Sequence, residues 1–245
     1  MIAVIGGSGL SKLASLEVTQ RKAVRTPYGE PSGALTFGRI GGRELVFLAR
    51  HGYGHTVAPH EVNYRANLWA LKEQGIESVV SVASVGGIRA DLAPGVLAIP
   101  DQIIDYTWGR RSTYSEGAGA PVTHIDFTEP YDRALRGRLL AAARACGEAV
   151  VDGGCYAATQ GPRLESAAEI TRLERDGADM VGMTGMPEAA LARELQLAYA
   201  AIAVSANYAA GRGDSERAIP LERIEQVLAE AMGRVRRVIE ALVSA

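Results

Sequence analysis

Residues 62–88 are VNYRANLWALKEQGIESVVSVASVGGI, a segment in which a helical pattern is followed by a strand. The first part places apolar side chains at helical spacing and predicts a helix over 62–74, with Gly75 as its stop. The second part is almost continuously apolar, as in a strand covered on both faces, and it predicts a strand over 78–83. Strands that alternate with helices are typical of α/β folds with a largely parallel sheet.

The same alternation extends along the whole chain. Short β-rich runs predict further strands over 2–5, 35–40, 45–49, 96–104, 150–159, 179–183 and 200–206. Helices are expected over 132–146, 166–176 and 187–196, and a last helix carries an apolar stripe from Leu221 to Leu242. We therefore expect one domain over residues 1–245, with a central mixed, largely parallel sheet flanked by helices. Ligands of such sheets bind beyond the carboxyl ends of the strands.

Composition narrows the classes of function. The 245 residues include 26 basic and 28 acidic side chains, and this formal net charge of −2 offers no general attraction for nucleic acid or for anionic membranes. The apolar runs are too short to span a bilayer and the first residues lack a signal-peptide pattern, so a cytoplasmic protein is expected. Cys146 and Cys155 have no metal-binding spacing and are expected to be reduced, buried thiols. His55 and His60 lack the clustered partners of a zinc site, so no metal is expected.

Two candidate anion-binding turns follow strands in the first quarter of the chain. In residues 4–10, VIGGSGL, backbone amides and the hydroxyl of Ser8 are suited to an oxyanion, and a plain tight turn is the alternative. In residues 49–55, ARHGYGH, the planar fork of Arg50 can hold two phosphate oxygens and His51 can donate a further bond. A surface turn that happens to contain these residues is the alternative there.

The ends of later strands carry further candidate ligands. Ser84 and Thr184 can offer hydroxyl groups to an anion, or they can simply lie at strand-to-turn junctions. Met183 is suited to the floor of a sugar site, although a methionine in an apolar strand is more often part of the core. Glu165 either caps a helix or accepts a ligand N–H. Asn207 either ends a strand or uses its amide, which both donates and accepts, to bind a heterocycle.

Taken in order, these segments resemble the family of trimeric purine nucleoside phosphorylases and methylthioadenosine phosphorylases. The resemblance extends from Gly6 to about Leu228, and it is strongest in Arg50-His51-Gly52 with His55-Thr56 and Pro59, in Val62-Asn63-Tyr64-Arg65-Ala66-Asn67, in Gly161-Pro162-Arg163, and in Met183-Thr184 with Pro187-Glu188. Members of this family split a purine from its ribosyl group with inorganic phosphate, without a metal or an organic cofactor. The resemblance implies the nucleoside phosphorylase fold, a homotrimer, and a nucleoside and phosphate as co-substrates.

The resemblance also assigns roles to residues at matching positions. Phosphate binding is expected from Ser8, Arg50, His51, Ser84 and Thr184. Substrate binding is expected from Met183 under the ribose, from Leu164, Glu165 and Asn207 at the base, and from Leu221 and a neighbouring subunit's His124 at the 5′ side. Leu164 takes the place of an aromatic residue that usually stacks on the base. Asn207 and His51 are the residues expected to take part in the chemistry.

Two departures from the family pattern indicate the substrate. Methylthioadenosine-specific members carry aspartates at the positions of Asn207 and Ala209, whereas an amide at Asn207 can donate to the O6 or N7 of a 6-oxopurine. Glu165 stands where the 6-oxopurine branch has a glutamate that accepts from N1–H, a hydrogen that adenine lacks. At the 5′ side, the histidine of inosine-cleaving members is missing and residues 218–221, AIPL, are apolar. A 6-oxopurine with an apolar 5′ group corresponds to 5′-methylthioinosine.

Other functions remain open from the sequence alone. Within the family, the alternatives are a methylthioadenosine phosphorylase and an inosine/guanosine phosphorylase. A nicotinamide oxidoreductase would depend on Gly7-Ser8-Gly9, but Lys12 stands where the dinucleotide fingerprint needs a third glycine. A non-catalytic purine-binding module is disfavoured because Arg50, His51 and Thr184 supply a phosphate site. No Ser-His-Asp or Cys-His arrangement is evident.

Overall fold

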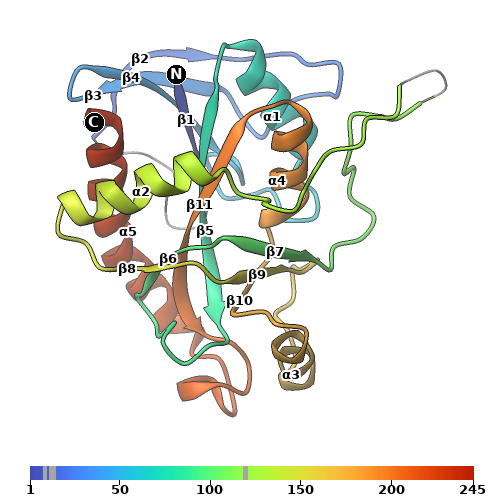
Figure 1. Cartoon of the computed structure of the whole chain (residues 1–245), viewed down its shortest axis with the longest axis vertical. Coiled ribbons are helices and arrows are strands. Elements are labelled where there is room, and N and C mark those ends of the chain that lie inside the picture. The colour runs from blue at the N-terminus through green and yellow to red at the C-terminus, as the bar shows by residue number, and fades with distance from the viewer. Residues whose placement is uncertain (8–9, 11–14, 118–120) are drawn as a thin grey trace.

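Strand β5 (Ser78–Gly87) forms the centre of the sheet in the computed structural model, which describes residues 1–7, 10, 15–117 and 121–245. It pairs in parallel with β1 (Ile2–Gly6) and β11 (Ala198–Tyr208), and antiparallel with β10 (Met180–Gly182). The described strands form one mixed sheet whose main order is β2-β3-β4-β1-β5-β10-β9-β7, and β11 joins it to β6 and β8 (Figure 1).

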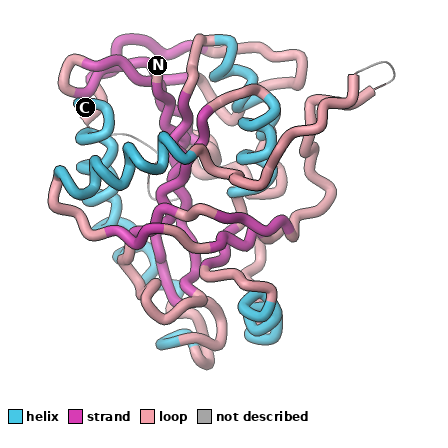
Figure 2. The backbone as a smooth tube through the Cα atoms, viewed as in Figure 1, coloured by secondary structure: helices cyan, strands magenta, loops and turns pink. Residues whose placement is uncertain are grey.

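The remaining strands are β2 (Glu17–Lys22), β3 (Leu35–Ile40), β4 (Arg43–Ala49), β6 (Leu97–Ile99), β7 (Gln102–Asp105), β8 (Val150–Asp152) and β9 (Cys155–Ala158). The helices are α1 (Tyr64–Glu73), α2 (Arg133–Ala145), α3 (Ala167–Arg175), α4 (Gly185–Glu194) and α5 (Leu221–Ser244), with a short 3-10 turn over Gly213–Ser215. Figure 2 shows the strands running through the middle of the molecule with helices around them. The fold is the expected α/β arrangement, with a central mixed, largely parallel sheet.

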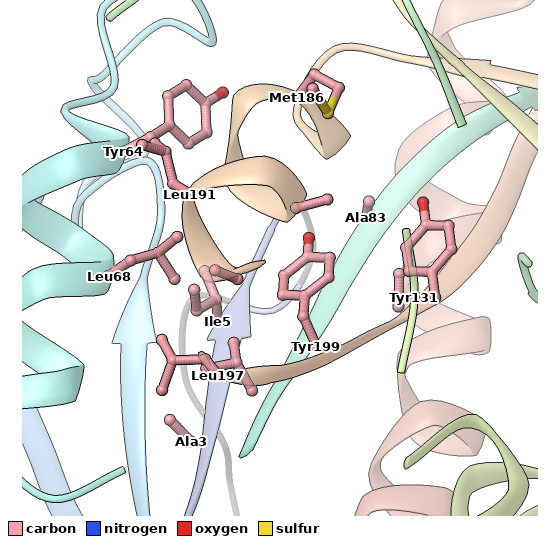
Figure 3. Packing of buried hydrophobic residues seen from close by; sticks show 14 of the residues in the cluster. Ala3, Ile5, Tyr64, Leu68, Ala83, Tyr131, Met186, Leu191, Leu197 and Tyr199 are labelled. Atoms are coloured by element: carbon pink, nitrogen blue, oxygen red, sulfur yellow. The ribbon is translucent and has the colours of Figure 1, made fainter. Parts of the chain in front are cut away.

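Helices cover the sheet because each presents an apolar face. On one side, α1 and α4 pack against each other over a core that includes Ile5, Leu68 and Leu191 (Figure 3). On the other side, α2 and α5 pack together over Val204 and its neighbours in a second cluster. The predicted stripe of α5 is buried from Leu228 onward, as its helical spacing requires.

The structure corrects several sequence predictions about strands. Pro100 and the Gly153–Gly154 pair interrupt the runs 96–104 and 150–159, and each run forms two strands instead of one. Strand β2 was not expected because all of its residues are exposed and it has no apolar face. Cys146 and Cys155 are free thiols as predicted, but both are half-buried, not fully buried.

The carboxyl ends of β1, β4, β5 and β11 meet at one edge of the sheet, since these strands are linked through parallel pairs. A β-bulge in β11 between Ser205 and Asn207 shifts the register against β5. Such a bulge re-aims side chains, and here the adjacent residues Ala206 and Asn207 both line the cavity at this edge. In the described part of the chain, no helix is long and apolar enough to cross a membrane.

Candidate active site

A cavity of about 430 Å³ opens at the carboxyl ends of the central strands, a size suited to a small ligand. It brings together eight of the residues that the sequence singled out: Arg50, His51, Ser84, Leu164, Glu165, Met183, Thr184 and Asn207. They come from five places in the chain between the end of β4 and the end of β11. The topology of the sheet, and not proximity along the sequence, therefore assembles the site.

Arg50 is fully buried and is held by a carboxylate from α4. Its Nε donates to Glu188 Oε2 at 2.7 Å and its Nη2 donates to Glu188 Oε1 at 3.0 Å. Nη2 also donates to Ser81 Oγ at 2.7 Å, and Nη1 donates to the Val82 carbonyl at 3.0 Å. The prediction that the planar fork of Arg50 holds two phosphate oxygens is wrong in this respect, because Glu188 occupies the fork.

These partners use four of the five N–H groups of Arg50, and the fifth, on Nη1, is bound by none of them. Gly7 lies next to this nitrogen, and a Cβ at Gly7 would stand 2.8 Å from Nη1 and 2.5 Å from the Val82 carbonyl oxygen. Glycine is thus required for the turn after β1 to lie against the guanidinium. Burial lowers the pKa of Arg50, but the ion pair with Glu188 outweighs it, and the net shift is upward. The group stays charged.

Tyr199 completes the support of this ion pair. Its hydroxyl donates to Glu188 Oε1 at 2.8 Å, the oxygen that also accepts from Arg50 Nη2. Burial and the nearby Glu188 raise the pKa of Tyr199 well above its usual value, so the hydroxyl keeps its proton and remains a donor. Arg50, Glu188 and Tyr199 form a buried unit that fixes the direction of the remaining Arg50 N–H.

His51 lies beside Arg50 with a defined tautomer. Its Nδ1 is 2.8 Å from the Val57 carbonyl oxygen, which can only accept, so Nδ1 carries the hydrogen and Nε2 carries the lone pair. Burial and the charge of Arg50 lower the pKa of His51 to about 4. The imidazole is therefore neutral near pH 7 when the cavity holds no anion.

The floor of the cavity is formed by the turn after β10. Gly161 has φ of +60°, and a Cβ there would lie 2.4 Å from the Met183 sulfur. The absence of a side chain at Gly161 lets the loop after β9 close over Met183. The neighbouring Thr184 is buried, and its backbone N–H donates to the Tyr156 hydroxyl at 3.3 Å.

Glu165 and Asn207 lie at the end of the cavity assigned to the base. Glu165 does not cap α3, because Ser166 is the N-cap and forms a capping box with Glu169. Glu165 Oε1 instead accepts from Thr159 Oγ1 at 2.7 Å, while Asn207 Nδ2 donates to the Tyr208 carbonyl at 2.6 Å. The second Asn207 N–H and its carbonyl oxygen remain for a ligand.

The 5′ side is apolar, but its residues differ from those predicted. Ile219, Ile224 and Leu228 line the cavity. Leu221 does not line it and is 61% exposed, so the prediction that Leu221 contacts the substrate is wrong in this structure. On α5, Ile224 and Leu228 lie four residues apart on one face, whereas Leu221 is the first residue of the helix and is exposed beyond the cavity.

Two other predicted residues remain. Ser8 lies outside the described residues. His124 is exposed on the segment that projects between β7 and α2 (Figure 1), and it does not line the cavity of its own chain. Within the described ranges, no group of three or more His, Cys, Asp or Glu residues is arranged to hold a metal ion.

Sequence reasoning gave no role to three side chains that shape the site: Glu188, Tyr199 and Arg110. Glu188 stood within the Pro187-Glu188 pair that carries the family resemblance, and a glutamate in an apolar helix is an indication of a buried partner. Tyr199 and Arg110 gave no such signal, because a tyrosine in a strand and an arginine in a polar loop are common.

Comparison with known proteins agrees with this geometry. A family model described as the phosphorylase superfamily matches residues 1–244. The chain belongs to this superfamily. It is 54% identical to a probable S-methyl-5'-thioinosine phosphorylase of Xanthomonas campestris, over 95% of this chain and 93% of that protein. It is 52% identical to another of the same name from Pseudomonas syringae, over 99% and 98% of the two chains.

Among solved structures, methylthioadenosine phosphorylase from Schistosoma mansoni in complex with adenine superposes with a TM-score of 0.94 at 31% identity. The match covers 99% of this chain and 90% of that one. The family expected from the ordered motifs is thereby confirmed, and so is the nucleoside phosphorylase fold.

Proposed function

We propose that the superfamily member described here catalyses phosphorolysis of 5′-methylthioinosine to hypoxanthine and 5-methylthioribose 1-phosphate. The observation that carries the proposal is a single cavity with an amide and a carboxylate at one end and aliphatic side chains at the other. The names of the relatives at 54% and 52% identity support the same substrate.

The base end favours a 6-oxopurine. Glu165 lines the cavity and can accept from the N1–H of hypoxanthine, and the second N–H of Asn207 can donate to O6 or N7. Adenine has no N1–H to donate to the Glu165 carboxylate, and a mismatched buried polar group of this kind costs about 1–3 kcal/mol. Ala209 is buried beside Asn207 and supplies no carboxylate to accept from a 6-amino group.

The 5′ end favours a methylthio group over a hydroxyl. Ile219, Ile224 and Leu228 offer no hydrogen bond, so a 5′-hydroxyl would be desolvated without a partner from these residues. A methylthio group instead buries apolar surface against them. The difference between the two substrates is expected to be about 10- to 200-fold in kcat/KM.

The phosphate end supports an attack on C1′ from the face opposite the base. A phosphate oxygen forms the new bond to C1′ as the bond from C1′ to N9 breaks, and HPO₄²⁻ loses the proton that the released base gains. Arg50, His51, Ser84 and Thr184 would hold the anion in place, which is the main source of rate in such a displacement. The donor on Asn207 would stabilise the negative charge that develops on the leaving purine.

His51 can take part in two ways that follow from its tautomer. With Nδ1 fixed by Val57, Nε2 accepts from a protonated phosphate oxygen, or it becomes a donor after taking up that proton. In either state His51 shares the phosphate's proton. The assignment of His51 and Asn207 as the residues that take part in the chemistry belongs to this proposal.

We further propose a cytoplasmic homotrimer in which His124 of one chain reaches the 5′ side of a neighbour's cavity. Support comes from the family resemblance and from the exposed position of His124 on a projecting segment (Figure 1). A residue so placed is free to contact another copy of the chain.

Phosphorolysis is tested by following hypoxanthine release from 5′-methylthioinosine with and without phosphate. We expect release only with phosphate, with an equal amount of methylthioribose 1-phosphate, and loss of turnover in Arg50→Ala. Release that is independent of phosphate would indicate a hydrolase, and an absence of release would contradict the proposed reaction.

A further inference from the structure

Arg110 joins the two loops that carry the opposite ends of the candidate site. It lies on the segment between β7 and α2, and it is half-buried. Its Nη1 donates to the carbonyl oxygens of Met183 at 2.8 Å and of Met186 at 2.6 Å. Its Nη2 donates to the carbonyl oxygens of Thr159 at 3.2 Å and of Gln160 at 2.8 Å.

The remaining donors complete this arrangement. Nε donates to Gln160 Oε1 at 3.1 Å, and Nη1 also lies 3.3 Å from the Tyr64 hydroxyl. The guanidinium carbon lies 5.6 Å from the centre of the Tyr64 ring, a cation–π contact. The acceptors named here are all neutral oxygens. The contacts therefore depend on the planar shape of the guanidinium, because its five N–H groups point toward these oxygens in fixed directions.

Each loop carries residues that the proposed reaction needs. The loop after β10 holds Met183 and Thr184, which line the ribose and phosphate part of the cavity. The loop after β9 begins with Thr159, whose hydroxyl donates to Glu165 at the base end. Arg110 does not line the cavity, so it acts on the substrate only through the backbone that it holds.

From these contacts we infer that Arg110 is a positioning residue, which sets the distance between the base-binding and the ribose- and phosphate-binding halves of the site. The inference rests on the proposed function, because that function gives the two loops their roles. A displacement of reacting groups by about 1 Å can lower a rate about 100-fold. Loss of Arg110 should therefore lower catalysis far more than it weakens binding of either product alone.

The test compares Arg110→Met and Arg110→Lys with the wild-type chain and with a control, Arg111→Met. Arg111 is its exposed neighbour and pairs with Glu116. Turnover is measured on whichever nucleoside the wild-type chain cleaves best. Hypoxanthine affinity and binding stoichiometry are measured by calorimetry. The substrate preference of the wild-type chain tests the proposed function. The ratio of the variant kcat to the wild-type kcat tests the role of Arg110. A failure of the proposed function can therefore be distinguished from a failure of the inference about Arg110.

We expect kcat to fall about 100-fold in both Arg110 variants, with full hypoxanthine-binding stoichiometry and a change in affinity of less than about fivefold. Lysine should not rescue, because one ammonium cannot span both loops. Arg111→Met should change kcat by less than about twofold.

Three results would overturn the inference. A fall in stoichiometry that matches the fall in activity would assign Arg110 a purely structural role. Recovery of activity in Arg110→Lys would mean that the positive charge of Arg110, and not its planar guanidinium, supports catalysis. Unchanged kcat in Arg110→Met would exclude any role in positioning.

Discussion

Asn207 presents an amide where an aspartate would present a negative carboxylate, and in the proposed function this difference decides which purine the base end accepts. A carboxylate repels the O6 of a 6-oxopurine and accepts from a 6-amino group, whereas the amide N–H donates to O6 or N7. The Asn207 side chain already donates one N–H to the Tyr208 carbonyl, which holds the amide plane at the cavity wall. In the proposed function, the base preference is thus set by a group whose orientation the backbone fixes.

Replacement of Asn207 by Asp together with Ala209→Asp should move the preference toward the 6-amino base. We expect the ratio of kcat/KM for methylthioadenosine to that for methylthioinosine to rise at least tenfold, because each mismatched buried polar group costs about 1–3 kcal/mol. Steady-state kinetics on both nucleosides measure this ratio. An unchanged ratio in the double variant would remove Asn207 and Ala209 from the base site.

Glu188 illustrates a residue whose effect on the site is indirect. Its carboxylate is fully buried, binds the fork of Arg50 and accepts from Tyr199. In Glu188→Gln the buried guanidinium loses its counter-charge, and removal of one partner of such a pair typically destabilises a protein by about 3–5 kcal/mol. Chemical denaturation should show a loss of this size, whereas the exposed Glu73→Gln should change the free energy of unfolding by less than about 0.5 kcal/mol. A loss below about 1 kcal/mol for Glu188→Gln would show that Arg50 does not depend on this pair.

Among elements, α5 uses one apolar face both for the core and for the wall of the cavity. Its central and C-terminal turns bury Val235, Ile239 and Leu242 in the core, while Ile224 and Leu228 near its N-terminus line the cavity. The proposed 5′ specificity thus depends on where this helix begins and on its rotation about its own axis.

Ile224→Asn should therefore shift the 5′ preference. A polar side chain at this position can pair with a 5′-hydroxyl and removes apolar contact from a methylthio group, so the inosine-to-methylthioinosine ratio of kcat/KM should rise about tenfold or more. Leu221→Asn is the matched control, since Leu221 is exposed outside the cavity. A larger shift in Leu221→Asn than in Ile224→Asn would reverse the assignment of these two residues.

Elements with an apolar face could be predicted from the sequence, and those without one could not. The five helices were anticipated to within a few residues because their spacing and their glycine stops are local signals. Strand β2 has no buried side, and periodicity therefore gave no indication of it. Leu221 was predicted in place of Ile219 because the loop 209–216 that precedes both residues is hard to align with the family pattern.

The residues of the candidate site also divide into those that could be predicted from the sequence and those that could not. Ser84 and Asn207 lie near the carboxyl ends of β5 and β11, and parallel pairing brings these ends together, so their convergence was predictable. Met183 and Glu165 follow β10 and β9 instead, and β10 pairs antiparallel with β5, so parallel pairing did not predict their approach. The partner of Arg50 was not predictable, because Glu188 lies 138 residues further along the chain and meets Arg50 only through the fold. The contacts of Arg110 are with backbone carbonyls, which leave no trace in side-chain identity.

At the scale of the whole molecule, His124 is the residue whose proposed role requires more than one chain. It is exposed and lies away from the cavity of its own chain. If it completes a neighbour's site, Arg50→Ala and His124→Ala chains should complement each other. Mixed oligomers then contain sites with a normal Arg50 from one chain and a normal His124 from another.

Co-expression of the two variants with different affinity tags allows the mixed species to be isolated. We expect its turnover to exceed that of either variant alone, and light scattering to give the mass of three chains. A mixed species no more active than the sum of its parts, or a monomer in solution, would contradict the proposed role of His124.

The central claim is that one cavity combines a 6-oxopurine site with an apolar 5′ site. It is tested most directly by the kcat/KM values for methylthioinosine, methylthioadenosine, inosine and adenosine, measured side by side with saturating phosphate. We predict that methylthioinosine exceeds methylthioadenosine and inosine at least tenfold each, with adenosine lowest. A preference for methylthioadenosine would contradict the roles of Asn207 and Glu165, and a preference for inosine would contradict the apolar 5′ wall.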